Sequence, residues 1–201
     1  MTDKARRGRP RNPAVDRAIL DMALTLFIEG GLDNVSYDQI SRRSGVSRAA
    51  IYRRWASRPQ LLVAAIEART ADDDASPPDW AERDFRARLD WFILQTPKLM
   101  LSPFYRRLAG EIIAQPQARA DLTFLFNETI ARPQRLIFAR LMQAAITEDI
   151  IDEAAPADLI YDMLYGALLN RLVSHTDGGG EDEVRRYLVG LLATLGLKTG
   201  N

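Results

Sequence analysis

Apolar residues recur at helical spacing along most of the chain. The first stripe comprises Val15, Ala18, Ile19, Met22, Ala23, Leu26 and Phe27. This spacing indicates an amphipathic helix, with Asn12-Pro13 as a typical start and Gly30-Gly31 as a typical end. No segment shows the strict alternation of a strand. The pattern predicts an all-α protein of about nine helices.

Capping signals mark the starts of the next three helices: Ser36 with Gln39, Ser47, and Ser57 with Gln60. A serine with Gln three residues later forms a capping box at a helix N-terminus. Ser44-Gly45 should end the first segment after about two turns. The succession of short helix, glycine turn and short helix over residues 36–55 predicts a helix-turn-helix, whose second helix enters the DNA major groove. Ser57 then opens a fourth helix, expected to end near Ala71.

The second of these short helices, residues 47–55, has two different faces. Ile51 and Trp55 lie one turn apart and should face a small core. The opposite face carries Arg48, Ala49, Tyr52 and Arg53. Guanidinium groups suit guanine edges or phosphates, the phenol suits phosphate, and the alanine methyl suits thymine. The alternative is a solvated basic face on an ordinary helical hairpin.

These residues closely resemble the TetR family of transcriptional regulators. The resemblance covers residues 13–66 and rests on Ala18–Ala23, Val35–Ile40, Ser44–Ser47, Ala50–Trp55 and Ser57–Leu62. It implies a three-helix DNA-binding domain, joined by the fourth helix to a helical C-terminal domain. The residues expected at or near DNA are Ser36, Tyr37, Ser47, Arg48, Ala49, Tyr52 and Arg53. Arg58 stands where the family often has a phosphate-binding lysine, whereas Trp55 and Arg54 replace commoner residues.

Charge is distributed unevenly, although the net charge is +0. Residues 1–60 hold 12 basic and six acidic residues, and the remainder is acidic by the same margin. A basic block suggests a polyanionic partner. Its first part, residues 1–12, forms a basic arm in which the stretch Arg6–Arg11 resembles an AT-hook. Arg7 and Arg9 would then enter a narrow minor groove, or the arm only adds nonspecific phosphate attraction.

The acidic and proline-rich stretch 72–78 predicts a domain boundary. We therefore expect a helix-turn-helix domain over 13–72 and a second domain over 75–201. In the second domain Asp79 should cap a helix, Pro97 and Pro103 should break the chain, and Pro133 should kink or split a long helix. Two further helices are expected over about residues 156–175 and 181–196.

The resemblance implies that the C-terminal domain binds a small molecule and dimerises. Aromatic and polar residues suited to a ligand pocket are Trp91, Phe92, Gln95, Phe104, Thr123, Phe124, Asn127 and Arg140. Residues expected at a dimer interface are Leu159, Met163, Gly166, Ala167, Asn170, Val184, Leu188, Leu191 and Leu192. Both sets have a plain alternative, because the same residues could pack in the core of one chain.

Composition excludes several other functions. The absence of cysteine and the single histidine, His175, leave no thiolate or histidine pair for a metal, and we expect no cofactor. No catalytic serine motif or phosphate-binding glycine loop is present, so we do not expect an enzyme. With no signal peptide or membrane span, the chain should be cytoplasmic. We expect a homodimeric, ligand-responsive repressor of a palindromic operator; the alternatives are an activator, or a regulator whose C-terminal domain only dimerises.

Overall fold

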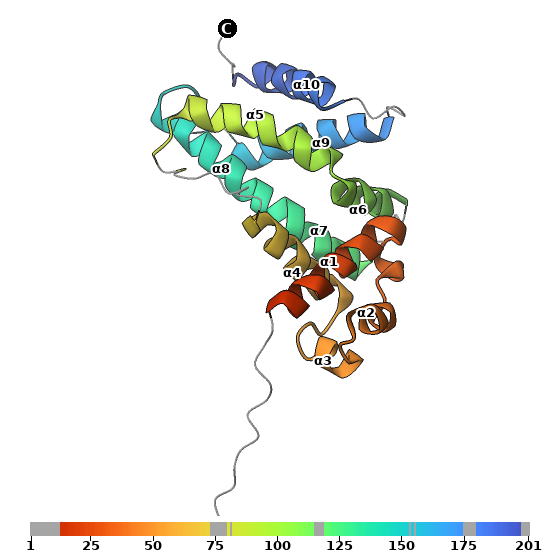
Figure 1. Cartoon of the computed structure of the whole chain (residues 1–201). Helices are drawn as coiled ribbons and strands as arrows, with labels where there is room; N and C mark the ends of the chain where they lie inside the picture. The colour runs from red at the N-terminus through yellow and green to blue at the C-terminus, as the bar shows by residue number, and fades with distance from the viewer. Residues whose placement is uncertain are drawn as a thin grey trace, which may run out of the picture. The chain divides into compact units, whose positions relative to one another are not determined.

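A computed structural model describes residues 13–72, 80, 82–114, 119–152, 154, 156–174 and 180–197. The chain divides into two compact units, Met1–Asp72 and Asp73–Asn201. Throughout the described ranges the regular structure is helical, with ten α-helices, a 3-10 turn and a π-helical turn (Figure 1). The predicted all-α class is confirmed. No described helix is both long and apolar enough to cross a bilayer.

The N-terminal unit consists of α1 (Pro13–Gly30), the 3-10 turn (Leu32–Asn34), α2 (Tyr37–Ser44), α3 (Arg48–Tyr52) and α4 (Arg58–Asp72). Helices α1 and α4 pack on each other, and α2 contacts both α1 and α3. The core contains Ile19, Phe27, Ile40, Ile51 and Leu61, which are all fully buried. Because α3 has five residues, it depends on this packing rather than on its own backbone bonds.

The predicted caps are present at the starts of these helices. The hydroxyls of Ser36, Ser47 and Ser57 accept hydrogen bonds from the backbone N–H of Gln39, Ala50 and Gln60, respectively, at 3.3–3.4 Å. Gly45 ends α2 with a φ of 70°, which is the left-handed conformation that favours glycine. The second helix of the motif is shorter than predicted, because α3 ends at Tyr52 and the chain leaves it in a turn.

The C-terminal unit contains α5 (Phe85–Leu101), α6 (Pro103–Ala114), α7 (Ala120–Phe126), the π-helical turn (Asn127–Ala131), α8 (Arg132–Thr147), α9 (Ala157–Ser174) and α10 (Glu181–Thr194). Helix α5 is central: it contacts α6, α8 and α10, and α9 contacts both α8 and α10 (Figure 1). Phe92, Phe138, Leu141, Leu164 and Leu188 are almost completely buried between them.

Two predictions for α5 are wrong. The helix begins at Phe85, where Asp84 accepts a hydrogen bond from the Ala87 N–H at 2.8 Å, whereas Asp79 lies outside the described residues. Pro97 does not break the chain but sits inside the helix, buried with Ile93 and Met100. The burial of these side chains offsets the backbone hydrogen bond that proline cannot donate.

Pro133 lies within a long helical run, which changes from α-helical to π-helical geometry just before the proline. α7, the π-helical turn and α8 form one continuous helical run, and Pro133 lies in the first turn of α8. If this run is counted as one helix, the described part of the chain contains nine helices. The wider π-helical turn accommodates the proline, which has no N–H to donate.

Candidate nucleic-acid interface

The structure brings four predicted contact residues together on one exposed side of α3. Arg48, Ala49, Tyr52 and Arg53 are all exposed, and Tyr52 keeps 52% of its surface accessible. Ile51, on the other side, is fully buried. We call these four residues the α3 face. It presents two guanidinium groups, a phenol and a methyl group, which together can contact phosphates and base edges.

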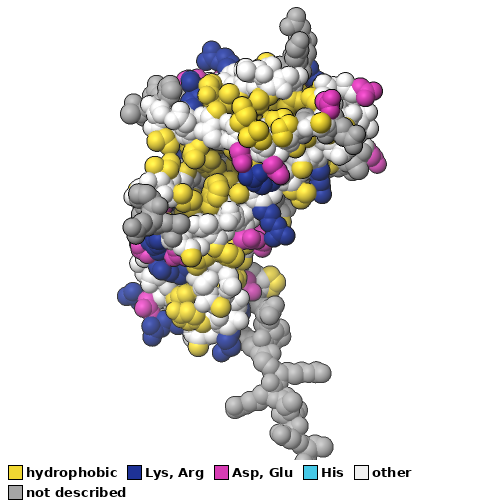
Figure 2. Space-filling model, turned by 180° about the vertical axis from the view of Figure 1, so that it is seen from behind, with side chains coloured by type: hydrophobic (Ala, Val, Ile, Leu, Met, Phe, Trp, Pro, Cys, Tyr) yellow, Lys and Arg dark blue, Asp and Glu magenta, His cyan; other side chains and the backbone are white. Residues whose placement is uncertain are grey.

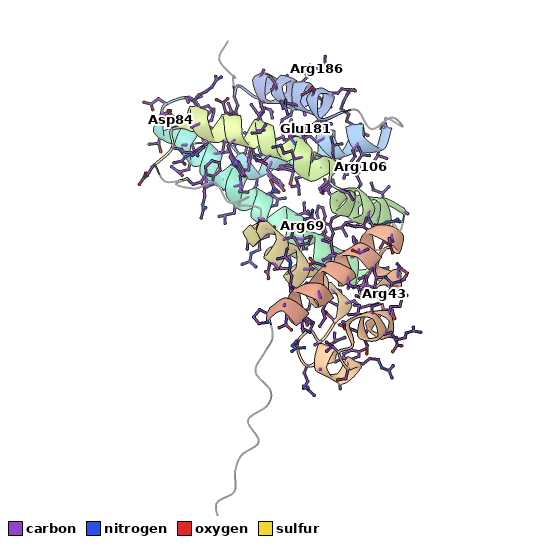
Figure 3. The ribbon with its side chains drawn as sticks, viewed as in Figure 1. Arg43, Arg69, Asp84, Arg106, Glu181 and Arg186 are labelled. Carbon is purple, nitrogen blue, oxygen red and sulfur yellow. The ribbon has the colours of Figure 1, made fainter. Side chains whose placement is uncertain are left out.

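Two further arginines extend this basic surface onto α2. Arg42 and Arg43 are exposed, and Figure 3 labels Arg43 at the surface of the N-terminal unit. Figure 2 shows Lys and Arg side chains spread over this unit. The sequence reasoning did not select these two residues, although their position in the last turn of α2 in a helix-turn-helix was a usable signal.

The Tyr37 side chain is buried behind the α3 face and does not point to solvent. Its hydroxyl donates a hydrogen bond to the Trp55 carbonyl at 3.0 Å. Its ring centroid lies 4.2 Å from that of Tyr52. Burial raises the Tyr37 pKa to about 12, with a smaller contribution from Tyr52. The Tyr37 hydroxyl therefore stays protonated and holds the chain just after α3.

An ion pair also holds the end of α3 against α1. Arg54 Nε lies 3.3 Å from Asp16 Oδ1, and about a quarter of each side chain is exposed. The Tyr37 hydrogen bond and this ion pair thus fix consecutive residues, Arg54 and Trp55. A five-residue helix held at its end in this way keeps its outward side chains in a defined orientation.

The other residues predicted to contact DNA cap helices, bind the turn after α1 or lie outside the described residues. Ser36 and Ser47 use their hydroxyls as helix caps. Arg58 Nη1 donates to the Leu32 carbonyl at 3.1 Å and lies 3.6 Å from Asp33 Oδ1, so its guanidinium braces the turn after α1. Arg7 and Arg9 lie outside the described residues.

The predicted ligand-pocket residues differ in their exposure to solvent. Phe92 and Phe104 are buried and Trp91 and Gln95 are half-buried, whereas Thr123, Phe124, Asn127 and Arg140 are exposed. A different polar set lies inside the C-terminal unit: Thr96, Tyr105, Gln134, Tyr161 and Tyr165, from α5, α6, α8 and α9. We call it the phenol cluster.

Hydrogen bonds and burial define the phenol cluster. The Tyr165 hydroxyl donates to Gln134 Oε1 at 2.8 Å and also interacts with Thr96. Burial raises the pKa of Tyr105 and of Tyr161 to about 12. Only 3% of Tyr105 is exposed. Sequence reasoning missed this cluster because its members are scattered from residue 96 to residue 165.

The residues predicted for a dimer interface fall into two groups. Leu159, Met163, Gly166 and Asn170 are exposed on α9, and Ala167 and Leu191 are half-buried. Val184, Leu188 and Leu192 of α10 are instead buried in the core of their own chain. This corrects their assignment to an interface, because the inward face of α10 packs on α5 and α9.

Comparison with protein families finds two matching models that follow one another along the chain. Residues 19–65 match the model described as bacterial regulatory proteins of the tetR family. Residues 77–190 match the model described as the tetracyclin repressor-like C-terminal domain. The second model alone covers more than half of the chain.

Two curated relatives align along most of their length. The chain is 35% identical over 168 residues to the DNA-binding transcriptional repressor TetR of Mycobacteroides abscessus, covering 83% of this chain and 84% of the relative. It is 27% identical over 188 residues to the uncharacterized HTH-type transcriptional regulator YdeS of Bacillus subtilis, covering 90% of each. Both are named as regulators of transcription.

Solved structures share the fold. The TetR family transcription regulator SCO0332 superposes with a TM-score of 0.64 at 24% identity, covering 89% of this chain and 97% of the other. The transcriptional regulator FadR of Bacillus subtilis, in complex with stearoyl-CoA, gives 0.63 at 18% identity, covering 92% and 98%. Together with the two family models and the relative from Mycobacteroides abscessus, these matches establish that the chain belongs to the TetR family of DNA-binding transcriptional regulators.

Proposed function

We propose that the protein is a dimeric repressor that binds a palindromic operator and is released from it by a small molecule. The observation that carries this proposal is the α3 face, with Tyr52 and Arg53 turned outward and the end of α3 fastened by Tyr37 and Arg54. In a dimer, two α3 helices would enter successive major grooves about 34–36 Å apart. The repressor named in Mycobacteroides abscessus supports this direction of regulation.

An exposed apolar stripe on α9 supports the dimer. Leu159, Met163 and Val173 keep 56%, 53% and 52% of their surfaces exposed, while the opposite side of α9 is buried. A helix that is apolar on both sides is normally covered on both sides. Figure 2 shows hydrophobic side chains gathered on one face of the C-terminal unit. A second copy of this chain would cover the stripe, and a single helix-turn-helix contacts too few base pairs for operator specificity.

The phenol cluster supports the ligand site. Polar groups that converge inside an apolar helical domain are typical of small-molecule sites, and the FadR complex with stearoyl-CoA is an example in a protein of this fold. The Tyr105 hydroxyl, which stays protonated because burial raises its pKa to about 12, can donate a hydrogen bond to a ligand. A ligand that binds better to the DNA-free state than to the DNA-bound state shifts the equilibrium by its difference in affinity, typically about 1–3 kcal/mol.

Selection from a random pool of DNA duplexes tests the core of the proposal. The full-length protein is expected to enrich a sequence with two inverted half-sites, spaced by about one helical turn. Electrophoresis of the selected duplex should show that two protomers bind together. Enrichment of no sequence would refute operator recognition, and an asymmetric single site would refute the dimeric arrangement.

A further inference from the structure

The helix-turn-helix carries one acidic side chain among basic neighbours. Residues 36–55 contain five arginines and a single acid, Asp38. Asp38 lies in the first turn of α2, and its Oδ1 is 2.7 Å from Arg48 Nη1. A carboxylate on such a surface repels phosphate and weakens binding to DNA of every sequence. Its presence therefore calls for an explanation.

A contribution to folding stability does not explain the ion pair between Asp38 and Arg48. The two side chains are 63% and 55% exposed, and ion pairs at such exposure contribute little to folding. The carboxylate is also favourable at the N-terminus of α2, but Ser36 already caps this end. What Asp38 changes most is the position of Arg48, the first residue of α3.

An arginine can contact a base edge specifically only if its guanidinium group is held in one orientation. Arg48 is half of the positive charge of the α3 face, and an untethered guanidinium on its flexible stem can settle on any nearby phosphate. A carboxylate that accepts from one edge leaves the other N–H groups free to donate to a base.

We propose that Asp38 is a positioning residue for DNA specificity: it holds one edge of the Arg48 guanidinium so that the other edge is presented to a base. Asp38 thus weakens binding to all DNA and increases the preference for the correct sequence. The inference rests on the proposed DNA contacts of the α3 face.

The test compares full-length variants on two duplexes. One is the duplex that the wild type selects from a random pool, and the other is a scrambled version of it. Anisotropy titrations at one salt concentration give the affinity for each duplex. The variants are Asp38→Asn, Asp38→Glu and, as a control for charge, Asp90→Asn. Asp90 forms a similarly exposed ion pair with Arg86 on α5.

We expect Asp38→Asn to bind the scrambled duplex about two- to fivefold more tightly, because one repelling charge is gone. The ratio of the two affinities should fall about five- to twentyfold, because a base contact loses its orientation. Asp38→Glu should restore much of the ratio, and Asp90→Asn should leave both affinities unchanged. In an Arg48→Ala background, Asp38→Asn should no longer change the ratio.

Three results would overturn the inference. Affinity for both duplexes could rise by the same factor, the ratio could fall equally without Arg48, or Asp90→Asn could reproduce the effect. These differ from failure of the proposed function, in which the wild type itself selects no sequence. Thermal melting of each variant shows whether the fold is intact. If Asp38→Asn lowers the melting temperature, Asp38→Glu provides a variant that keeps the negative charge.

Discussion

Individual side chains around α3 have two separable tasks. Tyr52 and Arg53 are exposed and available to DNA, whereas Tyr37 and Arg54 use their polar groups inside the unit. Sequence reasoning assigned Tyr37 to DNA with the others, because a tyrosine next to a capping serine gives no sign of where its hydroxyl goes. Only the fold brings Tyr37 to Trp55, 18 residues further along the chain.

Replacement of Arg53 by alanine should impair DNA binding without affecting folding. The side chain is exposed, so its loss creates no cavity, and one base or phosphate contact is worth about 1–3 kcal/mol. We expect a loss of operator affinity of about tenfold or more in a gel-shift titration, with the melting temperature unchanged. Arg106→Ala is the control, since Arg106 is exposed on α6 in the C-terminal unit (Figure 3). Equal affinities for wild type and Arg53→Ala would remove Arg53 from the contact surface.

Alkaline pH should destabilise the C-terminal unit through its phenols. Tyr105 has a pKa of about 12 when folded, against 10.0 for the ordinary side chain. Between these values the unfolded chain loses the proton while the folded chain keeps it, so the free energy of unfolding falls as pH rises. Each such group contributes a slope of up to about 1.4 kcal/mol per pH unit. Below pH 10 this contribution to stability is fully present.

Tyr105→Phe measures the share of one phenol. Urea unfolding at pH 9, 10 and 11 should give a shallower decline for the variant than for the wild type. Near pH 8 the variant should be about as stable as the wild type, because phenylalanine keeps the buried aromatic ring. An unchanged slope would show that Tyr105 is solvated in the folded protein.

Among the elements, those with local signals were predictable. The caps at Ser36, Ser47 and Ser57 depend on hydrogen bonds to residues three positions away, which the sequence contains in full. Pro97 was misjudged because what keeps α5 helical there is burial against other helices. Such packing involves residues far away in the sequence, so the residues next to Pro97 do not indicate it.

Apolar stripes predicted the helices α9 and α10 but not their partners. Leu188 and Met163 look alike in sequence, each one turn away from another apolar residue. In the structure Leu188 is fully buried and Met163 is 53% exposed. Periodicity shows that a face is apolar; whether its own chain or a second chain covers that face depends on the fold.

Removal of the basic arm should reduce the salt dependence of DNA binding. Residues 1–11 contain five basic residues and one acid. If the arm contacts phosphates or a minor groove, its deletion should weaken binding. It should also flatten the plot of log affinity against log salt by about four units at most. Identical slopes for the full-length and truncated proteins would show that the arm makes no contribution. Selection with both proteins would reveal any lost preference for flanking A·T pairs.

For the whole molecule, regulation requires that the DNA-binding and C-terminal units act together. The α3 face can recognise one half-site, and the exposed α9 stripe offers a surface for a second copy of the chain. Affinity and specificity for a palindrome then depend on both copies at once. The most direct test of the proposed assembly is therefore to disrupt the stripe and measure DNA binding at the other unit.

Met163→Asp and Leu188→Asp should give opposite results, although both place a charge on an apolar stripe. Met163 is exposed in the single chain, so its aspartate variant should fold, with normal helical circular dichroism. A charge buried without a partner in both subunits should separate the dimer into monomers near 22.6 kDa in light scattering. Operator affinity should then fall by about a hundredfold or more, because one half-site must supply it alone. Leu188→Asp buries its charge in the core of each chain and should lower the unfolding free energy by about 3–5 kcal/mol, or prevent folding. A folded, dimeric Met163→Asp protein with full operator affinity would place the subunit interface away from the α9 stripe.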